Sequence, residues 1–224
     1  MLTLSEKLLL LALNDEKGSV VFSASTALPY GLAGAILLEL YLKDFISFRD
    51  DKVKVESRND TGNEILDDAL SLIIENNKLH DAKYWVQKLY SKISDLQERI
   101  ANNLVSKKIL TKEKHSFMWI INYNRYPTHD LNPENNVRES IKSIVLKRAD
   151  ANEEDLALIS LVQACELTNE IFDKSDRKRA KKRMKDIINN RQVSSAIAKT
   201  VEEINAAILT VIIASSVTTT VITS

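Results

Sequence analysis

A dense run of basic residues between Ser175 and Lys185 is the strongest candidate for binding chemistry in this sequence. On a helix these cations would span much of the circumference and leave Ala180, Met184 and Ile187-Ile188 to pack against the protein. Such a run could bind anionic phospholipid, because each cation near a negatively charged membrane contributes about 1 kcal/mol. The alternative is a solvated helix face that nearby aspartates partly neutralise. The cations are Arg177, Lys178, Arg179, Lys181, Lys182, Arg183 and Lys185, and the aspartates are Asp173, Asp176 and Asp186.

An apolar segment from Phe117 to Ile121 is the second candidate. Its aromatic and branched residues, followed by a turn at 124–127, predict a strand of a β-hairpin. Alternation along that strand would place apolar side chains on both faces. An exposed hairpin of this kind would favour a partner subunit or a membrane, unless the domain itself covers it. The hairpin residues concerned are Phe117, Met118, Trp119, Ile120 and Tyr123.

Residues with catalytic or metal-binding chemistry are present but lack the required spacing. His80, His115 and His129 are far apart in the sequence, so we predict no metal site. Cys165 lies in an apolar stretch and is predicted to be a small buried hydrophobe rather than a nucleophile. No glycine-rich phosphate loop or serine elbow occurs, so we expect neither a catalytic site nor a cofactor.

The composition favours a mainly α-helical fold. The 224 residues are 44% hydrophobic and 28% charged, the balance of a globular protein that can bury a core. Four glycines and three prolines are too few for the turns of a many-stranded protein. We therefore predict a single helical domain over residues 1–224, built around a central helix bundle with one or two small β-hairpins. Basic and acidic residues number 31 each, so the overall charge does not favour a nucleic-acid partner.

Capping signals and periodicity predict the individual elements. The segment Thr3-Leu4-Ser5-Glu6 has the spacing of a capping box and predicts a helix start. Leu28 to Leu42 is predicted to be a buried helix in which Gly31 and Gly34 allow close approach of a neighbouring element. Ile46 to Val55 alternates like a two-stranded hairpin. Further helices are predicted at 64–78, 81–90, 92–106, 133–148, 153–172, 176–189 and 193–214.

Apolar segments near the two ends of the sequence could act as a signal peptide or a membrane anchor. The apolar run from Leu8 to Leu13 is too short for a signal peptide. Ile204 to Ser224 contains 21 residues without a charge, long enough to span a bilayer, but eight of them are serine or threonine. We predict a buried core helix there rather than a tail anchor. A single cysteine fits a reducing compartment, so a cytoplasmic protein is expected.

Several segments together resemble the Golgi phosphoprotein family. Their order and spacing match over nearly the whole chain, and the match starts at Leu2, so we expect a compact homologue without the N-terminal arm of the eukaryotic members. The segments are Leu2 to Leu13 with Asp15 and Gly18, Gly31 to Leu40, Leu66 to Leu70, Trp85-Val86, and Glu98 to Val105 with Ile109-Leu110-Thr111.

The resemblance implies a mainly helical adaptor without enzymatic activity, which binds phosphatidylinositol 4-phosphate through a basic pocket and self-associates through a hairpin. Arginine suits such a pocket because it binds a phosphomonoester bidentately. Only one of the corresponding positions holds a cation here, and each charge-assisted hydrogen bond contributes about 1.5–3 kcal/mol. We therefore expect phosphoinositide specificity to be weakened. By family position the pocket residues are Ser25, Ala33, Ser94, Gln97 and Arg99.

The leading hypothesis is a non-enzymatic peripheral adaptor that docks on an anionic phospholipid or phosphoinositide membrane surface and forms homo-oligomers. One alternative is a structural oligomeric scaffold that does not bind lipid. Another is a winged-helix-like nucleic-acid binder, suggested by helices that are followed by the 46–55 hairpin, in which the 177–185 run supplies the phosphate contacts. The sequence does not identify a protein client.

Overall fold

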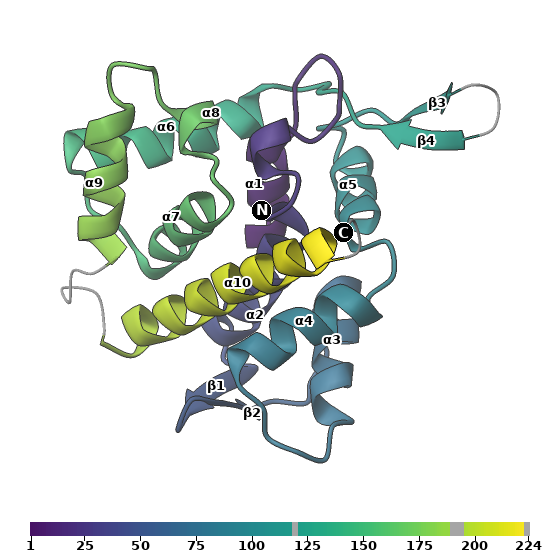
Figure 1. The fold of residues 1–224 in the computed structure, drawn as a ribbon, viewed down its shortest axis with the longest axis vertical. Coiled ribbons are helices and arrows are strands. Elements are labelled where there is room, and N and C mark those ends of the chain that lie inside the picture. The colour runs from purple at the N-terminus through teal and green to yellow at the C-terminus, as the bar shows by residue number, and fades with distance from the viewer. Residues whose placement is uncertain (118–120, 189–194, 222–224) are drawn as a thin grey trace.

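The protein folds into ten α-helices, a short 3₁₀ helix and two two-stranded sheets over the residues that the structure, a computed structural model, describes: 1–117, 121–188 and 195–221 (Figure 1). The predicted mainly α-helical class is thereby confirmed. In chain order the elements are α1 (Leu4–Ala12), η1 (Phe22–Ala24), α2 (Leu28–Leu42), β1 (Ile46–Arg49), β2 (Lys52–Val55), α3 (Glu64–Ile74), α4 (Ala82–Lys92), α5 (Leu96–Ser106), β3 (Glu113–Phe117), β4 (Ile121–Arg125), α6 (Asn132–Lys147), α7 (Glu153–Ala164), α8 (Thr168–Ile171), α9 (Arg177–Ile188) and α10 (Ser195–Val221).

Helix α2 is the centre of the core. Every residue from Gly31 to Leu40 is buried, as expected for a helix that is apolar on all sides. It packs against α1, α4, α7 and α10, and Figure 1 shows α10 crossing in front of it. Because each fully buried leucine or isoleucine contributes roughly 1.5–3 kcal/mol, this one helix supplies a large share of the hydrophobic stabilisation.

Two glycines of α2 allow its neighbours to approach closely, as predicted. A Cβ atom at Gly31 would lie 2.2 Å from the Sγ of Cys165, at the end of α7. A Cβ atom at Gly34 would lie 2.6 Å from the Cδ1 of Ile208 in α10. The thiol of Cys165 is fully buried, and this burial raises its pKa to about 12. Cys165 is therefore a packing residue, as expected from the sequence.

The contact between Gly31 and Cys165 predicts a compensating pair of substitutions. We expect Gly31→Ala to destabilise the protein by about 1–3 kcal/mol, because the new methyl group would overlap the sulfur, which is fully buried and would have to shift within the core. Cys165→Ala removes that sulfur, and the Cβ of residue 165 lies 4.0 Å from the new methyl group, an ordinary contact distance. The double variant should thus recover most of the loss in urea unfolding. Additive effects of the two substitutions would contradict this packing.

The predicted helix at 153–172 is wrong in one respect, because the chain forms two helices there. Helix α7 ends in a Schellman motif: the Leu167 amide donates to the Val162 carbonyl at 3.0 Å and the Glu166 amide donates to that of Gln163 at 3.2 Å. Glu166 adopts φ 57° to make this turn. The turn keeps Leu167 fully buried. Tertiary packing therefore outweighs the cost of placing Glu166, rather than the usual glycine, in a left-handed conformation.

The neighbouring helix boundaries also differ from the prediction. The helix predicted at 64–78 ends at Ile74, and the one predicted at 81–90 continues to Lys92. The helix predicted at 92–106 begins only at Leu96. Ile93, which lies within that predicted range, is instead the buried C-terminal cap of α4.

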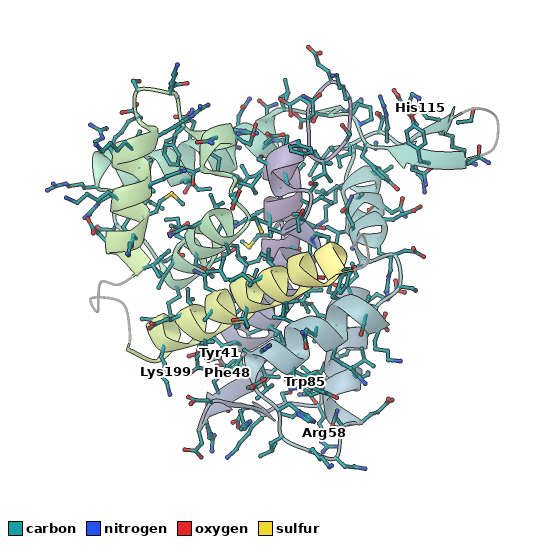
Figure 2. All side chains as sticks on the ribbon, viewed as in Figure 1. Tyr41, Phe48, Arg58, Trp85, His115 and Lys199 are labelled. Carbon is teal, nitrogen blue, oxygen red and sulfur yellow. The ribbon has the colours of Figure 1, made fainter. Side chains whose placement is uncertain are left out.

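The first hairpin forms as predicted. Ile46 pairs with Val55 and Arg49 with Lys52. The two turn residues, Asp50 and Asp51, have φ values of 53° and 58°, which two-residue hairpins with a type I′ turn require. The Nζ of Lys199 in α10 lies 2.9 Å from Asp51 Oδ1 and ties the turn to that helix (Figure 2).

The second hairpin exists, but its predicted register is wrong. Phe117 ends β3 and pairs with Ile121, the first residue of β4, so the two do not belong to one strand. Asn124 and Arg125, predicted in the turn, instead pair with residues of β3. The next residue, Tyr126, is buried and its amide donates to the Gly18 carbonyl at 2.9 Å. This anchor on the body of the protein places 124–126 at the base of the hairpin.

Helix α10 confirms the predicted core helix over 204–211, the part of the segment 204–224 in which one face of the helix is buried. Its residues Ile204, Ala207, Ile208 and Val211 are buried, and the helix packs on α2, α4 and α7. It extends to Val221, beyond the predicted end at residue 214. Within the described ranges, no helix combines the length and the apolar character needed to cross a bilayer.

Candidate functional site

Helix α9 places four lysines on one face. Lys178, Lys181, Lys182 and Lys185 follow the spacing i, i+3, i+4, i+7, which a helix of 3.6 residues per turn brings into one stripe. All four are exposed. The opposite face buries Ala180, Met184 and Ile187 against α6 and α7. Figure 1 shows α9 at an edge of the molecule, with its outer face open to solvent.

The arginines of α9, unlike its four exposed lysines, are partly buried or interact with other residues of the protein. The Arg177 guanidinium donates from Nε to the Phe172 carbonyl at 3.1 Å and from Nη2 to the Asn169 carbonyl at 2.9 Å. It therefore fastens the start of α9 to α8. Arg183 is half-buried. Arg179 forms an ion pair with Asp176 at 3.5 Å.

The four lysines keep their charge available for a ligand. In the described part of the chain, none of them has an ion-pair partner within 4 Å. Neutralisation by Asp173, Asp176 and Asp186, expected from the sequence as an alternative, is limited there to the pair between Arg179 and Asp176. The lysine stripe (Lys178, Lys181, Lys182 and Lys185) is thus a cationic surface patch.

The positions that the family resemblance assigns to a headgroup pocket are not gathered into one site. Ala33 is completely buried in α2 and offers no polar group to a ligand, whereas Ser25 is exposed after η1. Gln97 lines a cavity between α2, α4 and α5. Ser94 and Arg99 line a different hollow, which also contains Asp68 and Glu75 of α3.

Arg99 is already neutralised by acidic residues of α3. Its Nη1 lies 2.6 Å from Asp68 Oδ2, and its Nη2 lies 3.3 Å from Glu64 Oε1. These two pairs hold α5 against α3. Because two carboxylates surround the guanidinium, a phosphate would have to displace at least one of them before it could bind.

The second hairpin carries an exposed tyrosine, Tyr123, which pairs with His115 midway along the two strands. The ring of Tyr123 stacks on His115 with centroids 5.7 Å apart, and Arg125 lies over the same ring at 5.5 Å. Figure 2 shows His115 on the hairpin, away from the body of the protein. Met118, Trp119 and Ile120 lie outside the described residues. Phe117 is described as the last backbone position of β3.

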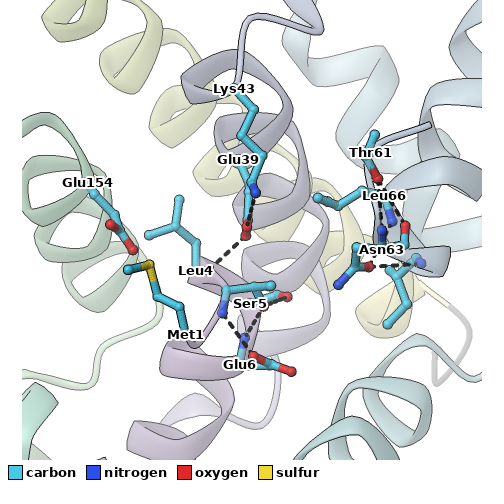
Figure 3. Close-up of polar contacts among 12 residues, drawn as sticks. Met1, Leu4, Ser5, Glu6, Glu39, Lys43, Thr61, Asn63, Leu66 and Glu154 are labelled. Carbon is cyan, nitrogen blue, oxygen red and sulfur yellow. Dashed lines mark hydrogen bonds and ion pairs between the residues drawn. The ribbon is translucent and has the colours of Figure 1, made fainter. Parts of the chain in front are cut away.

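Two buried carboxylates with functional potential were not identified from the sequence. Glu39 of α2 accepts a hydrogen bond from the Leu4 amide at 2.8 Å and lies 3.8 Å from Lys43 (Figure 3). Burial raises its pKa, and it caps the first turn of α1. The sequence does show a single acidic residue within the apolar helix 28–42, which could have indicated a buried carboxylate. Its hydrogen-bond partner, Leu4, could not be predicted, because it lies 35 residues earlier in the chain. Glu134 of α6 is the second such group and pairs with Arg138.

In the part of the chain that the structure describes, no group of three or more His, Cys, Asp or Glu side chains is arranged to hold a metal ion. The cluster that the geometry does offer is the lysine stripe, whose chemistry is the attraction of anions.

Comparison with known proteins identifies the family. The sequence matches the Golgi phosphoprotein 3 (GPP34) family over residues 4–204. It is also similar to the vacuolar protein sorting-associated protein 74 of Eremothecium gossypii, with 28% identity over 167 residues, which cover 66% of this chain and 50% of that protein. The chain thus spans about half the length of this curated relative. The resemblance noted in the sequence is confirmed: the chain belongs to the Golgi phosphoprotein 3 family.

Proposed function

We propose that this protein is a non-enzymatic peripheral adaptor that docks on anionic membrane surfaces through the lysine stripe of α9. The observation that carries the proposal is the set of four exposed lysines without ion-pair partners in the described residues. Membership of the Golgi phosphoprotein 3 family supports an adaptor role on the cytosolic face of a membrane.

The electrostatic attraction between the lysine stripe and an anionic leaflet is strong enough for reversible membrane binding. Each cation near an anionic leaflet contributes about 1 kcal/mol, so four of them contribute on the order of 4 kcal/mol at low salt. The overall charge of the protein is zero, so the attraction must come from this local concentration of charge. Binding should weaken steeply as salt shortens the Debye length from about 10 Å at 0.1 M.

The same reasoning argues against a strong preference for phosphatidylinositol 4-phosphate. Ala33 and Gln97 bring no cation to the headgroup positions, and Arg99 is engaged by two carboxylates. We expect binding to follow the surface charge of the membrane rather than the identity of its phosphorylated headgroup.

Flotation of the purified protein with liposomes tests the proposal. The vesicles should be neutral, phosphatidylserine-containing, or phosphatidylinositol 4-phosphate-containing at matched surface charge. Equal flotation with both anionic preparations, none with neutral vesicles, and loss at 0.5 M salt is the expected result. Selective flotation with the phosphoinositide would instead indicate a specific pocket. Absence of flotation from all three would favour a scaffold that does not bind lipid.

A further inference from the structure

A cavity of about 510 Å³ lies between the start of α1, the last turn of α2 and the start of α7. Figure 3 shows two of its carboxylates, Glu39 of α2 and Glu154 of α7, on the two sides of Leu4. The volume is within the range of small-molecule sites. Of the described residues that line the cavity, none belongs to α9, so the cavity is separate from the lysine stripe.

Glu39 brings to this cavity a buried carboxylate with one oxygen that lacks a hydrogen bond. Its side chain is only 9% exposed. Its Oε2 accepts from the Leu4 amide at 2.8 Å. Its Oε1 lies 3.8 Å from the Nζ of Lys43, beyond hydrogen-bond distance, and accepts no hydrogen bond from the described residues. Because buried charges are normally both paired and hydrogen-bonded, such an oxygen beside a cavity indicates a cationic donor from outside the chain.

The charges around the cavity favour a cation over an anion. Glu153 and Glu154 line it together with Glu39, and the last turn of α2 adds the negative end of a helix dipole. The starts of α1 and α7 both close with capping boxes, which already occupy amide donors that an anion would need. Glu154 is paired with Lys7 at 2.6 Å, so Glu39 is the carboxylate that a ligand would neutralise.

Apolar side chains form the remaining part of the wall. Leu2, Leu4 and Leu42 line the cavity, and Leu2 and Leu42 are only half-buried, so they can cover a hydrocarbon chain. We propose that this cavity binds a primary alkylammonium ion, whose ammonium donates to Glu39 and whose alkyl chain lies against these leucines. A phospholipid amine carries the same ammonium group beside a phosphate, which the carboxylates of α7 would repel, so a free amine fits better.

Ligand-observed NMR and calorimetry with the full chain test this proposal. The probes are hexylammonium, hexanol, hexanoate and phosphoethanolamine, each at millimolar concentration. Binding of hexylammonium alone is the expected result, with an affinity that rises about fourfold for each methylene group from butylammonium to hexylammonium. Absence of hexylammonium binding, or equal binding of hexanol or hexanoate, would overturn the proposal. Preferential binding of phosphoethanolamine would overturn the free amine and assign a lipid headgroup instead.

Glu39→Gln separates the charge of this residue from its structural hydrogen bond. Glutamine keeps an acceptor for the Leu4 amide, and the variant should be at least as stable as the parent because it removes a buried charge. We expect it to lower the hexylammonium affinity at least about tenfold, and unchanged binding would contradict the site. Glu16→Gln is the matched control, because Glu16 is exposed and lies outside the cavity lining. Leu42→Ala should reduce the affinity gain between butylammonium and hexylammonium.

The pH dependence of binding gives a readout that a structural role of Glu39 would not change. Burial raises the pKa of Glu39, while the Leu4 amide and Lys43 oppose the rise and Glu154 and Glu6 add to it. A bound cation favours the ionised carboxylate, so hexylammonium affinity should increase as the pH rises from 5 to 7. Glu39→Gln should flatten this dependence, and an affinity that does not vary with pH in the parent would contradict the assignment. The other charged groups of the surrounding segments are the Met1 amino group, Glu153, Lys7 paired with Glu154, and Lys107 paired with Glu6.

Discussion

Replacement of Lys178, Lys181, Lys182 and Lys185 by glutamine is expected to abolish flotation with anionic liposomes. The four side chains form one exposed stripe of α9 and have no ion-pair partners in the described residues. At about 1 kcal/mol for each cation, their loss should lower the partition coefficient on the order of 100- to 1,000-fold at low salt. Flotation or sedimentation with phosphatidylserine vesicles measures the change.

The control must change the net charge equally without touching α9. Lys17, Lys78, Lys83 and Lys114 are also exposed, and they lie in other parts of the fold. Their replacement by glutamine should leave most of the flotation intact. Equal losses in the two quadruple variants would mean that overall charge, rather than the lysine stripe, governs membrane binding. Both variants should keep the thermal stability of the parent, because surface substitutions of this kind usually change the stability by less than about 0.5 kcal/mol.

Replacement of Glu134 by glutamine is expected to change the pH dependence of stability. Glu134 is 1% exposed, and its Oε1 accepts from the Nε of Arg138 at 2.7 Å. Burial is the largest influence and raises the pKa of this carboxyl to about 7, while Arg138 opposes the rise and Asp15 adds to it. Glutamine keeps the shape and the acceptor for Arg138 but never carries a charge.

The direction of the effect follows from the proton balance. Between pH 4.5 and pH 7 the folded protein holds the Glu134 proton more strongly than the unfolded chain does, so the free energy of unfolding falls as pH rises. The contribution is fully present below pH 4.5 and is lost by about pH 7. Relative to Glu134→Gln, the unmodified protein should lose about 3 kcal/mol over this interval.

Urea unfolding at several pH values between 4.5 and 8 measures this difference. Glu139→Gln is the matched control, because Glu139 lies on the same helix but is exposed and forms a surface pair with Lys142 at 3.0 Å. That variant should follow the parent at every pH. Parallel curves for the parent and Glu134→Gln would show that Glu134 titrates normally in the folded protein.

The sequence predicted those features that arise from interactions over a few residues. The capping box at Thr3 and Glu6 forms as expected, and α6 starts at Asn132 with a proline in its first turn. The hairpin predicted over 46–55 forms, and its turn at Asp50-Asp51 depends on the backbone conformations of only these two residues. The lysine stripe of α9 could be identified because a helix exposes its polar residues wherever it packs.

The errors occurred where a local pattern is compatible with two structures. The apolar stretch that starts at Phe117 has the composition of a strand, but Tyr126 is held by Gly18, more than 100 residues earlier in the chain. That contact shifts the second hairpin by several residues. The break after α7 depends on the burial of Leu167, which only the assembled core enforces.

The sequence by itself determined the helical class, the family and the cationic surface of this protein, because composition, order of segments and amphipathic spacing are local properties. The tertiary structure alone decided which polar groups became buried. Glu39 accepts a hydrogen bond from the Leu4 amide, and Asp15 raises the pKa of Glu134. Tyr126 lines a cavity together with residues of α2 and α4. The cost of removing a carboxyl or hydroxyl group from water depends on the groups that surround it. In a folded chain those groups come from distant segments, and no local pattern records them.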